Sequence, residues 1–210
     1  MRVVILGCGY VGLELGRQLR GDHDVVGVRR SADGIAAIED AGFEGVQADV
    51  TDPDDLTTVP DADALVFAAS SGGRGADAAR EVYVEGQRTA LDAFAARDDP
   101  PERYVYTSST GVYGDHGGDW VDEGTPLEPT TGKTQVLAEA ERVAIEGAAD
   151  RGIDGTVARL AGIYGPDRYR LSRYVEGPVT EGYLNMIHRD DIAGAVAYLL
   201  REDLARGEVV

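Results

Sequence analysis

Three glycines near the amino terminus form the most specific chemical motif in the sequence. Gly7-Cys8-Gly9-Tyr10-Val11-Gly12 fits the pattern G-x-G-x-x-G, between an apolar run and an amphipathic stretch. In that context the first glycine permits a tight turn, the second lets a diphosphate approach the backbone, and the third lets helix and strand pack closely. Amides at the helix start, including those of Tyr10 and Val11, then bind phosphate oxygens. The motif predicts a dinucleotide site; the alternative is a glycine-rich turn without a ligand.

The residues after the second apolar run bear on which dinucleotide is bound. NAD sites place an Asp or Glu about 20 residues beyond the glycines, where it bonds the ribose 2′-hydroxyl. Here the sequence reads Val28-Arg29-Arg30-Ser31, without an acid. Guanidinium groups bind phosphate oxygens through paired donors, so Arg29, Arg30 and Ser31 favour NADP, with NAD as the alternative. Alternatively, the arginines only balance an acidic surface.

Two further strand ends are expected to line the adenosine half of this site. They are Asp49-Val50 and Ala68-Ala69-Ser70. Asp49 is equally well explained as a turn residue.

Short apolar runs alternate with amphipathic stretches, which is the pattern of a parallel sheet covered by helices. The expected strands are Val3–Leu6, Val25–Val28, Gly45–Ala48, Ala64–Ala68, Tyr104–Thr107 and Thr156–Leu160. The expected helices are Val11–Arg20, Ala32–Ala41, Ala76–Ala96, Thr134–Ala149 and Ile192–Arg201, with a short one capped by Asp52. Right-handed crossovers then predict an α/β fold: a Rossmann-type doubly wound parallel sheet with helices on both faces.

No linker or repeat divides the chain, so residues 1–210 are expected to form a single NAD(P)-binding domain. Within it, about residues 160–210 contribute a reduced substrate-side lobe. The final Gly207-Glu208-Val209-Val210 reads as the opening of another strand. The chain is therefore expected to be truncated at its carboxyl end, or else to have a small substrate lobe.

The charge balance excludes several classes of partner. There are 38 acidic and 20 basic residues, a net charge of −18, so a nucleic-acid partner is not expected. The acids are spread along the chain, as on surfaces that stay soluble in concentrated salt. No apolar run reaches the roughly 18 residues of a membrane span. The three histidines have no partners at metal-ligand spacing, so no metal is predicted. These features indicate a cytoplasmic protein.

Three later motifs extend the interpretation. They are Ser108-Ser109-Thr110-Gly111-Val112-Tyr113-Gly114, Arg159-Leu160-Ala161-Gly162-Ile163-Tyr164-Gly165-Pro166 and Asn185-Met186-Ile187-His188-Arg189-Asp190-Asp191-Ile192-Ala193. With the glycine loop, they resemble the extended short-chain dehydrogenase/reductases, the NAD(P)-dependent epimerase/dehydratase superfamily. The resemblance spans nearly the whole chain. It implies catalysis by a Ser or Thr, a Tyr, and a Lys four residues after the Tyr.

This sequence departs from that catalytic set. The resemblance puts Ser109 in the Ser/Thr place, Thr131 in the Tyr place and Gln135 in the Lys place. An aliphatic hydroxyl is not tuned into an acid–base as a phenol is, and Gln carries no charge. The only lysine, Lys133, lies two positions away, about 200° around a helix, and is expected to face solvent. The Tyr-x-x-x-Lys pair is missing.

Two functional hypotheses follow. In the first, the chain is an NADP(H)-binding, epimerase/dehydratase-like oxidoreductase with a non-standard active site. Its proton is moved by Ser109, Tyr113, Thr131 or a carboxylate of the loop 118–123. In the second, it is a catalytically inactive NAD(P)-binding redox sensor or partner-binding protein. Family analogy suggests a small-molecule substrate, such as a nucleotide sugar, and a homodimer formed through Ala76–Ala96 and Thr134–Ala149. Arg168 is expected to form salt bridges, with an acidic or phosphorylated substrate as the alternative.

Overall fold

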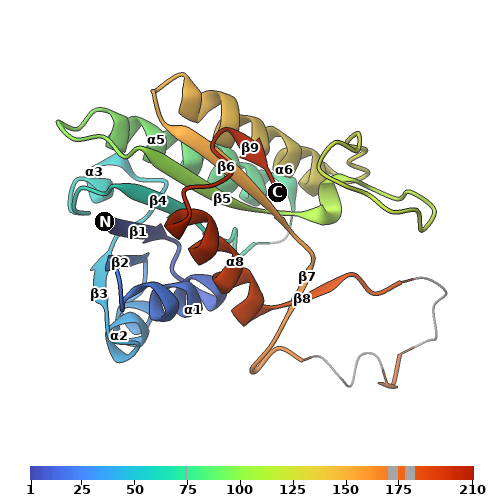
Figure 1. Cartoon of the computed structure of the whole chain (residues 1–210), viewed down its shortest axis with the longest axis horizontal. Coiled ribbons are helices and arrows are strands. Elements are labelled where there is room, and N and C mark those ends of the chain that lie inside the picture. The colour runs from blue at the N-terminus through green and yellow to red at the C-terminus, as the bar shows by residue number, and fades with distance from the viewer. Residues whose placement is uncertain (74, 170–174, 178–182) are drawn as a thin grey trace.

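The computed structural model describes residues 1–73, 75–169, 175–177 and 183–210. Seven parallel strands form one sheet in the order β3-β2-β1-β4-β5-β6-β9 (Figure 1). They are β1 (Arg2–Leu6), β2 (Asp24–Arg29), β3 (Glu44–Gln47), β4 (Ala64–Phe67), β5 (Arg103–Ser109), β6 (Asp154–Leu160) and β9 (Glu208–Val209). The predicted fold class is confirmed, and the last strand is the one expected at 207–210.

Helices cover both faces of the sheet (Figure 1). On one face lie α3 (Pro53–Leu56), α4 (Ala76–Arg80), α5 (Gly86–Ala95) and α6 (Gly132–Arg142). On the other lie α1 (Tyr10–Leu19), α2 (Ala32–Asp40) and α8 (Arg189–Arg201). Because β1 and β4 are apolar at nearly every position, they bury side chains in both layers: Val4 packs in one core and Ile5 in the other.

Two long helices depart from the predicted pattern. The expected helix Ala76–Ala96 contains a π-helical turn, η1 (Glu81–Glu85), between α4 and α5. The expected helix Thr134–Ala149 likewise passes from α6 into a second π-helical turn, η3 (Val143–Gly147). Such turns are rare and have no simple sequence signature, so apolar periodicity does not reveal them; they often occur at functional sites.

Three smaller elements complete the described part of the chain. The 3₁₀ turn η2 (Thr110–Val112) follows β5, and β7 (Gly162–Tyr164) pairs in parallel with β8 (Met186–His188). None of these was predicted, because each is only three residues long. None of the described helices has the length and apolar character needed to span a bilayer.

The strand order changes direction between β1 and β4. The chain runs from β1 outward to β3, then returns to place β4 on the other side of β1. The register aligns Leu6 with both Val28 and Phe67, so the carboxyl ends of these strands lie level. In open α/β sheets, ligands bind in the crevice outside this edge.

Candidate cofactor-binding site

A cleft of about 900 Å³ opens at the carboxyl ends of the central strands. Of the 13 residues predicted to bind the cofactor, the structure brings all but Gly12 to its wall. These are Gly7, Gly9, Tyr10, Val11, Arg29, Arg30, Ser31, Asp49, Val50, Ala68, Ala69 and Ser70. Four separate segments of chain therefore meet at the crevice that the sheet topology leaves open.

The glycine loop explains why each small residue is needed. Gly7 has φ +79°, and a Cβ there would lie 2.2 Å from the Cα of Ala69. A Cβ on Gly12 would lie 2.9 Å from Cγ2 of Ile5, so the third glycine serves helix–strand packing. A Cβ on Gly9 would meet only Nη1 of Arg29, at 3.3 Å, and a carbonyl oxygen at 3.7 Å. Packing demands the first and third glycines, whereas the second leaves room for a ligand.

That room suits a diphosphate. Gly9 is the N-cap of α1 and has no side chain to occupy the amides of the first turn. Those amides, with the helix dipole behind them, are suited to an anion. The amides of Gly7 and Cys8 are not available, because both donate to the carbonyl of Val28, at 3.1 and 2.9 Å. The residues present therefore fit the diphosphate of a dinucleotide at the start of α1.

The polar groups at the end of β2 are held in the cleft wall by neighbours. Nη1 of Arg29 donates to the carbonyl of Cys8 at 3.3 Å, and Arg30 pairs with Asp49 at 3.3 Å. Oγ of Ser31 accepts the amide of Gly34 and caps α2. Burial acts to raise the pKa of the Asp49 carboxyl, but hydrogen bonds from Thr51 and Arg30 hold it below its usual value. Asp49 is therefore ionised and partly neutralises Arg30.

The other end of the cleft carries hydroxyl groups and the only lysine. Ser109, at the end of β5, lines it, and its Oγ accepts the amide of Gly111 at 3.2 Å. Lys133 is exposed, as expected, yet it also lines the cleft. It lies in the first turn of α6, at the rim, from which a long side chain can turn inward. Gln135 is exposed and lies outside the cleft wall.

Two other candidate catalytic residues are positioned away from the cleft wall. Thr131 caps α6: its Oγ1 accepts the amide of Thr134 at 3.1 Å, and the Thr134 hydroxyl accepts the Thr131 amide in return. The hydroxyl of Tyr113 accepts Nη1 of Arg159 at 2.9 Å, and the guanidinium lies 4.8 Å from the centre of its ring. Motif alignment fixes a residue's place in the chain but not the direction of its side chain. The carboxylates of the loop 118–123 are also outside the lining.

Two tyrosines in the cleft wall were missed from the sequence. Tyr83 lies on the π-helical turn η1, and its hydroxyl accepts the amide of Ser71 at 3.3 Å. Tyr106 lies on β5 and is 1% exposed; its hydroxyl has no hydrogen-bond partner in the described part of the chain. Burial raises the pKa of Tyr106 far above its ordinary value. Neither tyrosine lies within one of the motifs quoted from the sequence, so nothing there marked them as part of the site.

Comparisons with known proteins place the chain in a family. A family model described as NAD(P)H-binding matches residues 7–203. Protein YeeZ of Escherichia coli strain K12 is 34% identical over 210 residues, covering 95% of this chain and 73% of its own length. A provisionally named NAD-dependent epimerase/dehydratase of Methylobacillus flagellatus is 34% identical with a TM-score of 0.81, over 99% of this chain and 73% of that one.

More distant structures share the fold. The dTDP-glucose 4,6-dehydratase of Bacillus anthracis, solved in complex with NAD, has a TM-score of 0.80 at 19% identity, over 100% of this chain and 74% of that one. This likeness concerns architecture alone, whereas the family model and the 34% identical relatives concern descent. The chain therefore belongs to the NAD(P)H-binding family, among the epimerase/dehydratase-like members of the extended short-chain dehydrogenase/reductase superfamily.

Proposed function

We propose that this chain is an NADP(H)-dependent, epimerase/dehydratase-like oxidoreductase with a non-standard active site. The observation that carries the cofactor choice is the end of β2, where Arg29, Arg30 and Ser31 line the cleft and no acid is present. An acid there would repel a 2′-phosphate, whereas two guanidinium groups attract one. We also propose a substrate of the nucleotide-sugar class.

The nicotinamide ring, when bound, exchanges a hydride with a substrate carbon. The chain's part is then to manage the charge and proton on the substrate oxygen. Ser109 is suited to this, because its Oγ accepts the amide of Gly111 and keeps its own proton to donate. Lys133, on the same cleft wall, supplies the positive charge that stabilises an oxygen anion. In this scheme Ser109 is the proton donor and Lys133 the electrostatic partner.

One set of observations favours the second hypothesis, a redox-responsive binding protein without turnover. The only lysine is preceded four positions earlier by Pro129, so the sequence holds no Tyr-x-x-x-Lys pair. The hydroxyls of Thr131 and Tyr113 both accept hydrogen bonds from within the protein. Ser109 is an aliphatic hydroxyl and by itself a weak acid–base, so in this hypothesis the cleft binds the dinucleotide and reports its redox state to a partner.

The decisive experiment measures binding and turnover separately, in concentrated salt. Calorimetric titration with NADPH and NADH, on the wild-type chain and on Arg29→Ala/Arg30→Ala, tests the cofactor choice. We expect NADPH to bind more tightly than NADH, and the double variant to lose that preference. Oxidation of bound NADPH is then followed against carbonyl compounds and nucleotide sugars.

The outcomes separate the hypotheses. Turnover that Ser109→Ala abolishes and that Lys133→Gln slows supports the enzyme. Tight binding without oxidation of NADPH by any substrate supports the sensor. A preference for NADH in the wild-type chain contradicts the NADP assignment. Light scattering in the same buffer tests the proposed homodimer.

A further inference from the structure

The cleft has the opposite charge to the rest of the molecule. The chain as a whole has 20 basic and 38 acidic residues. The cleft wall has four basic residues and one acid: Arg29, Arg30, Lys133 and Arg168 against Asp49. Among the described residues, only Arg30 of these four forms an ion pair, with Asp49. The cleft therefore holds three positive charges that no described carboxylate neutralises, which suits a ligand with several negative charges.

Arg168 has a defined place beside the glycine loop. Its guanidinium carbon lies 5.2 Å from the centre of the Tyr10 ring. Tyr10 is the first residue of α1 and follows Gly9 directly, so its amide is among those suited to the diphosphate. A guanidinium stacked on an aromatic ring loses side-chain freedom but keeps its N–H donors at the edge of the plane. Tyr10 thus holds Arg168 near the start of α1.

The backbone around Arg168 is also held by Tyr10. The Tyr10 hydroxyl donates to the carbonyl of Pro166 at 2.9 Å, and the amide of Arg168 donates to the carbonyl of Gly165 at 2.9 Å. Gly165 has φ +147°, and a Cβ there would lie 2.8 Å from the Tyr10 hydroxyl. Asp167 has φ +61°, a conformation that costs energy in a residue other than glycine. The turn is thus packed directly against the cofactor helix.

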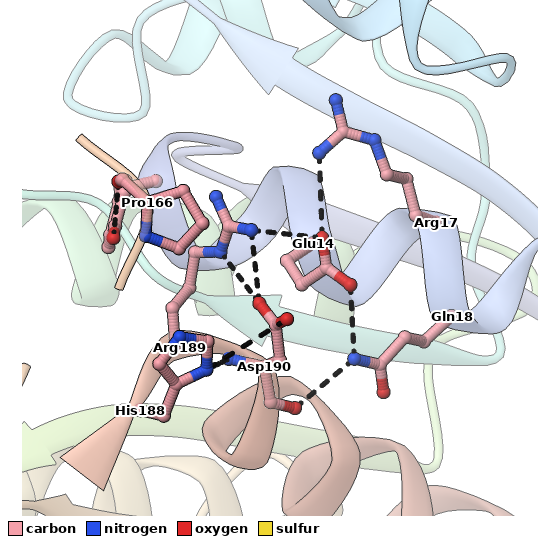
Figure 2. Close-up of polar contacts among 8 residues, drawn as sticks. Glu14, Arg17, Gln18, Pro166, His188, Arg189 and Asp190 are labelled. Carbon is pink, nitrogen blue, oxygen red and sulfur yellow. Dashed lines mark hydrogen bonds and ion pairs between the residues drawn. The ribbon is translucent and has the colours of Figure 1, made fainter. Parts of the chain in front are cut away.

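A second arginine at the same ring provides a comparison. The guanidinium carbon of Arg189 lies 5.0 Å from the Tyr10 ring centre. Arg189, however, pairs with Glu14 at 3.4 Å and with Asp190 at 3.0 Å, and Figure 2 shows it between these carboxylates. In the same group Gln18 donates to Glu14 and to the backbone of Asp190, joining α1 to α8. Arg189 is a structural cation with its charge neutralised, whereas Arg168 has no such pair within the described ranges.

We propose that Arg168 binds the diphosphate of the dinucleotide, from the turn after β7, while the glycine loop binds it from the end of β1. This inference rests on the proposed function and adds a diphosphate-binding residue to it. The salt bridges expected for Arg168 are absent from the residues that the structure describes, and its place in the cleft supplies the alternative partner, a phosphate. A second source of the same chemistry is the diphosphate of a nucleotide-sugar substrate; the proximity of Tyr10 to the helix start favours the cofactor.

The test compares Arg168→Ala with a matched control. Arg142→Ala removes an exposed arginine that has no ion pair to a described carboxylate and lies outside the cleft. Affinities are measured by calorimetry for NADPH and NADH, which carry a diphosphate, and for adenosine 2′-monophosphate, which does not. UDP-glucose is the probe for a substrate diphosphate. Arg168→Lys retains the charge but not the planar donors.

We expect Arg168→Ala to weaken the binding of NADPH and of NADH equally, by about tenfold, which is the usual effect of losing a charge-assisted hydrogen bond. Adenosine 2′-monophosphate is unaffected, Arg168→Lys is intermediate, and Arg142→Ala behaves as wild type. Unchanged NADPH affinity in Arg168→Ala overturns the proposal. So does an equal loss for adenosine 2′-monophosphate, which indicates a structural role, or a loss confined to UDP-glucose, which assigns Arg168 to the substrate. A wild-type chain that binds no nicotinamide nucleotide refutes the proposed function itself, and this assignment with it.

Discussion

A buried ion pair behind the cleft gives the sharpest stability prediction. The carboxylate of Glu141 on α6 accepts Oγ of Ser108 at 2.6 Å and Nη2 of Arg159 at 2.7 Å. The side chains of Glu141 and Arg159 are only 5% and 8% exposed. Burial opposes the charge of Arg159, but hydrogen bonds to Glu141 and Tyr113 hold the pKa of the guanidinium above its usual value. The pair joins the ends of β5 and β6 to α6.

Removing one partner leaves the other charge buried. Glu141→Leu takes away both hydrogen-bonded oxygens from Arg159, so we expect the free energy of unfolding to fall by about 3–5 kcal/mol. Replacing both partners, as in Glu141→Leu/Arg159→Met, removes the unpaired charge as well. Because apolar side chains of similar volume often substitute for a buried pair at little cost, the double variant recovers most of the loss.

The assay is urea unfolding followed by near-ultraviolet circular dichroism in concentrated salt. Glu139→Gln, on the same helix, is the control, because Glu139 pairs with Arg80 in an exposed ion pair worth about 0–1 kcal/mol. The reasoning is refuted if Glu141→Leu costs no more than Glu139→Gln. It is equally refuted if the double variant is no more stable than Glu141→Leu alone.

Three further predictions concern the cleft and its surroundings. Gly9→Ala should leave the thermal unfolding midpoint nearly unchanged but weaken the binding of NADPH at least tenfold. Gly7→Ala should instead lower the midpoint by several degrees, because its Cβ clashes with Ala69. Burial raises the pKa of Cys8 to about 12, well above the value near 8.5 of an unfolded thiol. Unfolding then releases a proton between those values, so stability falls as pH rises from 9. In urea unfolding of Cys8→Ala, the free energy of unfolding should fall less steeply with pH than in the wild type, by about 1.4 kcal/mol per pH unit. Finally, salt screens the long-range repulsion between a net charge of −18 and an anionic cofactor more than it screens the short contacts with the cationic cleft wall. NADPH affinity measured by calorimetry should therefore increase as salt is raised from about 0.01 M to 0.15 M; a steady decrease would show that the cleft cations outweigh the net charge.

Much of the fold could be predicted from the sequence, because parallel strands buried on both faces are continuous apolar runs. Val3–Leu6 and Ala64–Phe67 are such runs, and the sheet forms where they predict. β3 was displaced by one residue, since Val46 is the only large apolar residue in Glu44–Gln47 and no residue of the strand is fully buried. The tight turn and close helix packing at the glycine motif could also be predicted, because the backbone geometry at Gly7 and the packing at Gly12 follow from the strand–turn–helix context of the motif.

The catalytic end of the cleft was harder to predict because side-chain direction depends on contacts that the sequence does not show. Helix periodicity correctly predicts that Lys133 is exposed, but it does not show that the start of α6 lies at the cleft rim. Thr131 occupies the Tyr place by alignment, yet its hydroxyl completes a capping box. A residue that aligns with a family's catalytic position therefore supports a catalytic role only when its polar group faces the site and is free to contact a ligand.

That criterion separates structural from ligand-binding groups throughout this molecule. The hydroxyl of Tyr113 accepts from Arg159 away from the cleft wall, and the guanidinium of Arg189 is paired with carboxylates, so both stabilise contacts between elements. Ser109 keeps a proton to donate, and Lys133 and Arg168 carry charges that no carboxylate in the described part of the chain balances. Arg142 also has no ion pair to a described carboxylate but lies exposed outside the cleft, whereas Arg29, Lys133 and Arg168 converge on one cleft wall; an anion that enters the cleft best explains this grouping.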